Sequence, residues 1–337
     1  MKKPFILFLG SSWCGTTSVY YTLKNNLKYM HGGWGKELFT LSKIFSHLID
    51  PNEYSDSNEH ENIQREKDIL LFENDDDYNL FRYKNLQFSL RYHKSIDPDP
   101  ILVKFTEKEL NSFFGPHISL EKYVNHYVRL SEYCGEDYQA VGDFSNPNFL
   151  LSKNELNEVR LALSEYFDVK VLLSVRDPIR RHWSRTCAFS SGRRFPPRFG
   201  LNTEISDNFW KGKKLFNKYP QVINNAYDVF GKENVCYLVM EEFFDNRENN
   251  SEVSKLEQFL GVNIPEVYPC VFVPDRGINP PQIEGLADQW MSDTEILTPE
   301  FYNSARNSLF FDQIYSEFEE LHGSLPADWG RPIDYDY

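Results

Sequence analysis

Short apolar runs recur along the chain and predict the strands of a buried sheet. Pro4 to Leu9 is wholly apolar, and Val169 to Val175 is apolar apart from one lysine and one serine. Such runs are typical of strands that are covered on both faces in a parallel sheet. Tyr138 to Val141 and Val235 to Met240 predict two further strands.

Segments with helical periodicity follow several of these runs. After the first strand, apolar side chains recur at three- and four-residue steps, which predicts a helix ending near Gly32 and Gly33; they are Val19, Tyr20, Leu23, Leu27 and Met30. Ser152 and Glu155 have the spacing of a capping box and predict the start of a second helix.

Glycines mark the ends of the helices expected in the second half of the chain. Gln221 to Phe230 and Ser251 to Leu260 are each followed by a glycine, which commonly ends a helix. Thr298 and Pro299 combine a cap residue with a proline at the first helical position. They predict a long final helix that ends at Gly323.

Strands that alternate with helices predict the α/β class, with a mostly parallel central sheet between two helical layers. The 337 residues are 41% hydrophobic and 16% aromatic, enough to build one large core, so a single domain over residues 1–337 is expected. From about residue 50 to 99 the composition becomes polar and acidic. This segment is predicted to be an insertion beside the core.

The composition limits which partners the protein can bind and which compartment it is expected to occupy. The formal net charge of −14 argues against a nucleic-acid or anionic-membrane partner, so an anionic ligand needs a local basic patch. The 5 cysteines are odd in number and include no C-x-x-C pair, so they predict neither a disulfide framework nor a zinc site. No apolar stretch approaches the about 20 residues of a membrane helix, and a cytoplasmic protein is expected. The sequence carries no signal for an oligomeric state.

A polar loop joins the first strand to the first helix and reads Gly10-Ser11-Ser12-Trp13-Cys14-Gly15-Thr16-Thr17-Ser18. Backbone N–H groups and the helix dipole at such a position favour a bound phosphate, unless the segment is an ordinary strand-to-helix turn rich in cap residues. Gly15 allows a close approach, and the following three hydroxyls can donate to phosphate oxygens. An ATP-binding loop requires a lysine where Thr16 stands. Magnesium-dependent use of ATP therefore loses its main support.

A second candidate anion site follows the strand Val169 to Val175. Arg176 stands at the end of the strand, and Ser184 follows eight residues later, across the start of a helix. A guanidinium and a hydroxyl so placed can close on one phosphate through charge-assisted hydrogen bonds. Two phosphate-binding segments on one sheet predict a ligand phosphorylated at two separate positions.

On these two segments the chain resembles the sulfotransferases that use 3′-phosphoadenosine 5′-phosphosulfate (PAPS) and release 3′-phosphoadenosine 5′-phosphate (PAP). The glycine loop is similar to the family's 5′-phosphosulfate loop, and Arg176-Asp177-Pro178…Arg181…Ser184 to its 3′-phosphate motif. The resemblance implies the P-loop NTPase-like sulfotransferase fold and metal-free use of PAPS. It also implies nucleotide contacts from Ser12, Trp13, Cys14, Gly15, Thr16, Thr17, Ser18, Arg176, Ser184 and, in a loop covering the nucleotide, Arg276 and Gly277.

Further matches concern the acceptor. One match is the segment Lys36-Glu37-Leu38-Phe39, which is similar to a segment of carbohydrate and heparan-type sulfotransferases. The resemblance implies that Glu37, beside Lys36, is the catalytic base. It also implies a hydroxyl or amine acceptor, with carbohydrates the leading class. The segment with Asp143 and Phe144 is similar to one that lies near the acceptor. Arg194, in a basic loop, is a candidate for an anionic acceptor or for the 3′-phosphate, with a merely solvated loop as the alternative.

The chain departs from the family pattern at two lysines. Trp13 and Phe144 stand where the family has lysines, and a tryptophan cannot neutralise charge on the leaving phosphate. Either Lys36, Arg180 or Arg194 takes over, or the protein binds the nucleotide with weak or no turnover. Trp13 itself either stacks on a base or sugar or packs within the loop. Cys14, beside a helix N-terminus, is expected to have a lowered pKa.

Overall fold

The computed structural model describes residues 2–33, 40–45, 90, 94, 100–109, 119–182, 218–244, 250–267 and 299–330. Within these ranges a 5-stranded sheet has the order β2-β3-β1-β4-β5, and every pairing in it is parallel. The strands are β1 (Pro4–Phe8), β2 (Met30–His31), β3 (Ala140–Asp143), β4 (Asp168–Val175) and β5 (Val235–Val239). The prediction of an α/β chain with a parallel sheet is confirmed.

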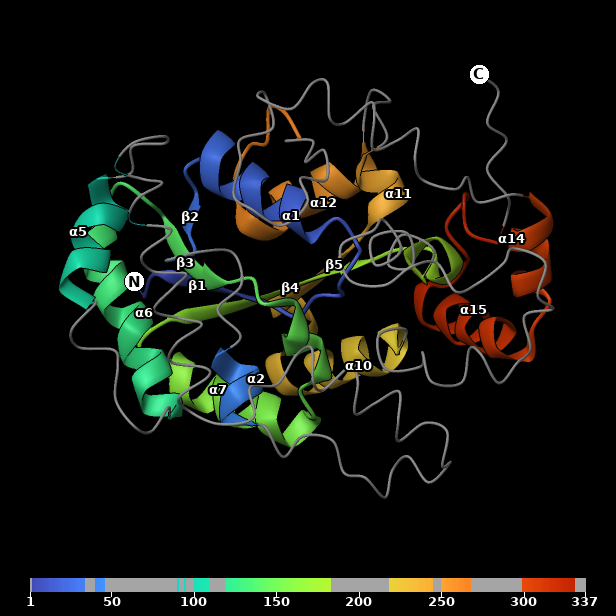
Figure 1. The fold of residues 1–337 in the computed structure, drawn as a ribbon, viewed down its shortest axis with the longest axis horizontal. Helices are drawn as coiled ribbons and strands as arrows, with labels where there is room; N and C mark the ends of the chain where they lie inside the picture. Colours follow the sequence, from blue (N-terminus) through green and yellow to red (C-terminus); the bar gives the residue numbers. More distant parts are fainter. Residues whose placement is uncertain are drawn as a thin grey trace, which may run out of the picture.

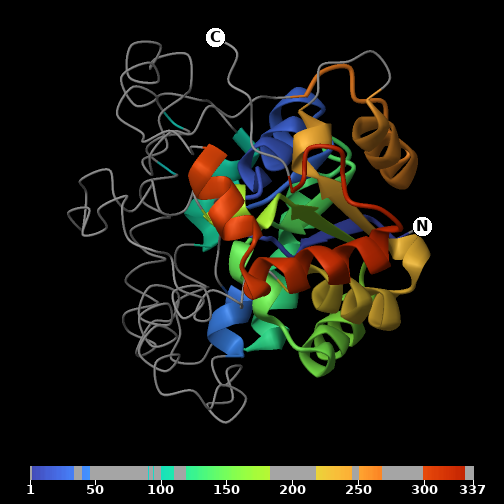
Figure 2. The ribbon, with the colours of Figure 1, turned by 90° about the vertical axis from the view of Figure 1, so that its right-hand side faces the viewer.

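Helices cover both faces of the sheet (Figures 1 and 2). On one side lie α1 (Thr16–Tyr21), α11 (Met240–Phe243) and α12 (Ser251–Leu260). On the other lie α2 (Thr40–Ile44), α6 (Leu120–Cys134), α7 (Lys153–Ser164) and α10 (Tyr219–Phe230). Helix α5 (Pro100–Glu109) packs beside α6, while α14 (Pro299–Arg306) and α15 (Leu309–His322) lie beyond one end of the sheet.

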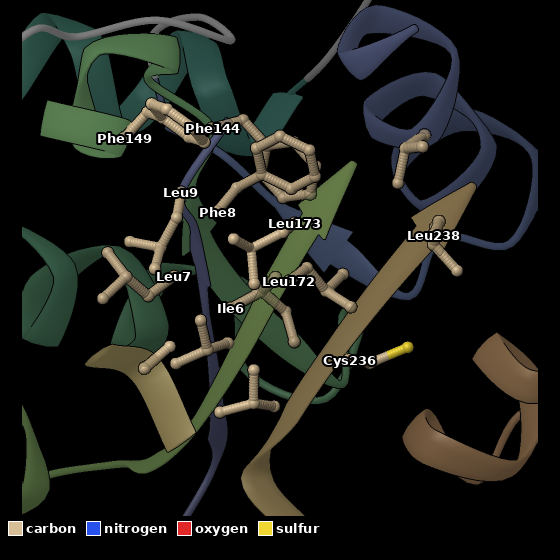
Figure 3. Close-up of a cluster of buried hydrophobic side chains, with 14 of the residues drawn as sticks. Ile6, Leu7, Phe8, Leu9, Phe144, Phe149, Leu172, Leu173, Cys236 and Leu238 are labelled. Carbon is tan, nitrogen blue, oxygen red and sulfur yellow. The ribbon is translucent and has the colours of Figure 1, made fainter. Parts of the chain in front are cut away.

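The core lies between these layers. Figure 3 shows apolar side chains of the three adjacent strands β1, β4 and β5 packed together, among them Ile6, Leu172 and Leu238. All three are fully buried. Truncating one of them to alanine costs about 2–5 kcal/mol in a typical core, so this cluster fixes the strands that carry the loops described below.

The first helix ends earlier than predicted. α1 continues as a π-helical turn over Thr22–Asn26, and Met30 and His31 then form β2 beside Ala140 and Val141. The expectation that the helix runs to Gly32 and Gly33 is therefore wrong. Met30 is buried on the sheet, and a short buried apolar segment fits a strand as well as a helix by periodicity alone.

At other helix ends, capping explains where the predicted and observed boundaries agree and where they differ. Ser152 and Glu155 form the predicted capping box, and α12 ends at Gly261, whose φ is 68°. The predicted final helix is divided in two, because the Ser308 hydroxyl donates to Ala305 O and accepts from Phe311 N to start α15. Helices α5 and α6 were not predicted.

The predicted acidic insertion at about 50–99 lies outside the described residues, apart from Leu90 and Lys94. Among the described helices, none combines the length and apolar character needed to cross a bilayer.

Candidate functional site

The two candidate phosphate segments leave the same edge of the sheet. β1 and β4 are adjacent and parallel, and their pairing continues beyond β1, because Ser174 N donates to Gly10 O (2.7 Å) and Ser11 N to Ser174 O (3.0 Å). The chain crosses to β2 and β3 on one side of β1 and to β4 and β5 on the other. In such sheets ligands bind at the carboxyl ends of the strands, where the order reverses.

The backbone of the first loop alternates in the sign of φ. Trp13 has φ 67° and Gly15 has φ 63°, while Cys14 between them is not in the positive-φ region. Alternation of this kind turns successive N–H groups into one concavity, which is a common anion-binding arrangement. A Cβ on Gly15 would meet the terminal methyl of Met240 in α11, which belongs to a flexible side chain and can move, so the positive φ is the main reason for glycine at this position.

The hydroxyls after Gly15 differ in exposure. Thr16 and Ser18 are buried, whereas Thr17 is partly exposed. The N–H groups of Ser18 and Val19 both donate to Gly15 O, so those of Thr16 and Thr17 precede the first helical hydrogen bond. Thr17 is therefore the hydroxyl best placed to meet a ligand.

The second segment begins with a buried aspartate. Asp177 Oδ1 accepts from the N–H groups of Ile179 and Arg180, both at 3.0 Å, which caps the helical turn 178–182. Its Oδ2 accepts from Tyr302 OH (2.5 Å), Tyr315 OH (2.8 Å) and Gly330 N (3.2 Å). One carboxylate thus joins the end of β4 to the C-terminal helices.

Two arginines of the second segment contact the first loop. Arg176 Nη1 donates to Trp13 O at 3.3 Å, and Arg181 Nε donates to Ser12 O at 2.9 Å. The Arg176 side chain is 33% exposed, whereas Arg181 is 2% exposed. Arg180 is buried against the Tyr302 ring, 5.9 Å from its centroid. The structure therefore brings the two predicted segments into direct contact.

Glu241 supports this junction from the end of β5. Its Oε1 accepts from Asp177 N (3.1 Å) and lies 3.9 Å from Arg176 Nε, and its Oε2 accepts from Trp329 Nε1 (3.0 Å). Burial raises the pKa of Glu241, although the nearby Arg176 guanidinium opposes this shift. Glu241 thus links the ends of β4 and β5 to the C-terminal segment that carries Trp329.

Cys14 differs from the expectation for a helix N-terminus. Its side chain is buried, and Sγ lies 3.6 Å from Tyr219 OH. Burial raises the pKa of the Cys14 thiol, so the predicted lowering is wrong. In the described ranges, no three His, Cys, Asp or Glu side chains are grouped to hold a metal ion.

Asp143 and Phe144 lie at the carboxyl end of β3 and are both buried. Asp143 accepts from Tyr123 OH (3.0 Å) and Ser145 N (2.9 Å), and burial raises its pKa. The Phe144 ring stacks on Phe8 with centroids 4.5 Å apart. Both side chains pack in the core, and this burial disfavours the prediction that they contact an acceptor.

The remaining predicted residues lie outside the described ranges; they are Lys36, Glu37, Ser184, Arg194, Arg276 and Gly277. Sequence reasoning missed the supporting contacts of Arg181, Glu241 and Trp329. Arg181 belongs to the matched 3′-phosphate motif and Glu241 follows β5 closely, but neither position indicates these hydrogen bonds. Trp329 lies 88 positions after Glu241 in the sequence, and no local sequence pattern predicts the contact between them.

Comparisons with known proteins support the fold. No family model matches the chain, and neither does any curated protein. A solved structure, the sulfotransferase from Alicyclobacillus acidocaldarius, is similar with a TM-score of 0.52 and 18% sequence identity. The similarity covers 98% of this chain and 100% of the other. The chain therefore has a sulfotransferase-like fold.

Proposed function

We propose that this chain is a sulfotransferase that moves the sulfuryl group of PAPS to a hydroxyl or amine of an acceptor. The observation that carries the proposal is the direct contact between two anion-binding segments on adjacent strand ends, through Arg176 and Trp13 O. A nucleotide with phosphates at its 3′ and 5′ positions matches two such segments. The sulfotransferase-like fold agrees with this assignment.

The proposed nucleotide contacts follow from the two segments. The N–H groups from Trp13 to Thr17 receive the 5′-phosphosulfate, while Arg176 and Ser184 receive the 3′-phosphate. Within the described residues, the protein contacts of Arg176 use Nε and Nη1, which leaves Nη2 for the ligand. Arg276 and Gly277 are proposed to cover the nucleotide.

The proposed reaction is an in-line displacement at sulfur. The acceptor oxygen or nitrogen forms a bond to sulfur, the bond from sulfur to the 5′-phosphate oxygen breaks, and PAP leaves with that electron pair. Glu37 takes the acceptor proton, and Lys36 lies beside it in sequence. The protein mainly positions the reactants and stabilises charge on the peripheral oxygens.

A second candidate function is nucleotide binding without turnover. Trp13 is the observation that favours it, because no lysine stands in the loop to neutralise the leaving phosphate. In that case PAP binds as well as in an active enzyme, but sulfate is not transferred from PAPS. A carbohydrate is the first acceptor class to test, and Arg194 is the proposed contact for an anionic one.

Calorimetry tests the proposal on the full chain. PAP, ATP and ADP are titrated with and without magnesium, and PAP is expected to bind more tightly than either and without metal. An assay of PAP release from PAPS in the presence of a panel of sugars then distinguishes an active sulfotransferase from a protein that binds the nucleotide without turnover. Magnesium-dependent preference for ATP would refute the proposal.

A further inference from the structure

Two consecutive carbonyl groups of the first loop are held by arginines of the second segment. Ser12 O accepts from Arg181 Nε at 2.9 Å, and Trp13 O accepts from Arg176 Nη1 at 3.3 Å. The strand-end loop that is proposed to bind one end of the nucleotide is thus fixed by residues of the loop that binds the other end.

These contacts decide where the N–H groups of the loop point. The peptide bonds after Ser12 and after Trp13 are both trans, so each carbonyl is opposed to the N–H of the next residue. Because both carbonyls face the arginines, the N–H groups of Trp13 and Cys14 face away from them. Trp13 also has φ 67°, a conformation that costs a non-glycine residue about 1–2 kcal/mol and persists only where its surroundings fix it.

The arginines also place positive charge behind the loop. Arg181 is 2% exposed, and a buried charge is screened much less than one in water. Arg180, one of the three residues named as substitutes for the missing lysine, lies over the Tyr302 ring. Of the three arginines at positions 176, 180 and 181, the first and last are the two with hydrogen bonds to the loop carbonyls.

We infer that Arg181 is a positioning residue for the 5′-phosphate loop: through Ser12 O it orients the Trp13 N–H toward the ligand, and its charge replaces part of what the lysine absent at Trp13 would supply. Arg176 has two roles in this inference: it donates a hydrogen bond to Trp13 O, and it contacts the 3′-phosphate of the proposed ligand. This inference rests on the proposed function, because it assumes that the loop receives the 5′ end of a bis-phosphorylated adenosine.

The test compares ligands that carry phosphate at one end or at both. PAP, adenosine 3′-monophosphate and adenosine 5′-monophosphate are titrated into the wild type, Arg181→Lys and the matched control Arg160→Lys. Arg160 lies on α7, where it donates to Asn157. Lysine keeps the charge at 181 but loses the Nε–H directed at Ser12 O.

The expected effect is specific to one end of the ligand. Arg181→Lys should weaken PAP and the 5′-monophosphate by about tenfold or more, the usual scale for a hydrogen bond to a charged group, and leave the 3′-monophosphate within about twofold. The control should leave all three unchanged. Equal weakening of all three ligands, or of none, would overturn the inference, since a merely structural arginine acts on both ends alike.

A second measurement on the wild type covers the case in which Arg181→Lys does not fold. Bound PAP should slow the hydrogen exchange of the Trp13 and Cys14 amides more than bound adenosine 3′-monophosphate does. PAP binding without such protection would overturn the inference while the proposed function stands. Failure of the wild type to bind PAP would instead overturn both.

Discussion

Replacing Asp177 by asparagine measures how firmly the C-terminal helices are attached to the end of β4. Oδ2 accepts from Tyr302 OH (2.5 Å), Tyr315 OH (2.8 Å) and Gly330 N (3.2 Å), whereas Oδ1 caps the turn 178–182. Asparagine retains one carbonyl oxygen, which preserves the cap. Its amide nitrogen cannot accept from the other three donors.

The magnitude follows from these bonds. A hydrogen bond to a charged group contributes about 1.5–3 kcal/mol, and two phenol hydroxyls lose such an acceptor, as does the Gly330 N–H through a longer bond of 3.2 Å. The hydroxyls of Tyr302 and Tyr315 lie 3.2 Å apart, so each can partly satisfy the other. We expect Asp177→Asn to lower the free energy of unfolding by about 2–4 kcal/mol, a large part of the about 5–15 kcal/mol typical of a domain.

Equilibrium unfolding in urea, followed by tryptophan fluorescence and circular dichroism, measures this loss. Asp312→Asn is the matched control, because Asp312 pairs with Arg306 at 3.0 Å on the surface and its side chain is 67% exposed. Exposed pairs of this kind contribute under about 1 kcal/mol. The two variants undergo the same chemical change, so their difference isolates burial and hydrogen bonding.

Two results would contradict the expected role of the Asp177 carboxylate. One is an Asp177→Asn protein whose free energy of unfolding lies within about 0.5 kcal/mol of the wild type, the range of an ordinary surface change. The other is strict additivity of Asp177→Asn and Tyr315→Phe, because residues that share a hydrogen bond show a coupling energy of about 0.5–3 kcal/mol in a double-mutant cycle.

Three further predictions concern chemistry and pH. Glu37→Gln should leave PAP affinity unchanged and reduce turnover by about 10²–10⁴-fold in a PAP-release assay, and an unimpaired variant would exclude Glu37 as the base. Cys14 should resist iodoacetamide at pH 8 in the native protein and react after denaturation, because burial raises its pKa; native labelling would contradict this. Burial raises the pKa of Tyr29 from 10.0 to about 12. The neutral phenol therefore contributes roughly 3 kcal/mol to the free energy of unfolding, a contribution that is complete below pH 10 and is lost by pH 12, as urea unfolding at each pH would measure. Tyr29→Phe should lose stability less steeply over that range, and an identical slope would count against the shift.

The parts of the fold that sequence predicts best are those whose signal is local. β1 and β4 were found because a run buried on both faces is apolar throughout, and α7 because Ser152 and Glu155 cap it within four residues. β2 was missed because Met30 belongs to a strand only through its pairing with Ala140, 110 positions away. Ser308 divides the last helix through its own side chain, which periodicity does not register.

In the candidate site, too, features with a local sequence signal were predicted and features that depend on distant contacts were not. The loop around Gly15 and the strand end at Arg176 were predicted from residue type and spacing. The sequence places both segments on one sheet but does not predict that they touch, and the hydrogen bonds of Arg181 and Glu241 are visible only in the structure. The surroundings of Cys14 were misjudged because its position beside a helix start favours the thiolate, whereas burial, which the sequence does not reveal, disfavours it more strongly.

A crystal structure of the protein with PAP would show whether one nucleotide bridges the two segments. We expect a single nucleotide that spans both strand ends, with its 5′-phosphate accepting from N–H groups between Trp13 and Thr17 and its 3′-phosphate on Arg176. A nucleotide bound elsewhere, or one whose two phosphates do not reach both segments, would contradict this expectation.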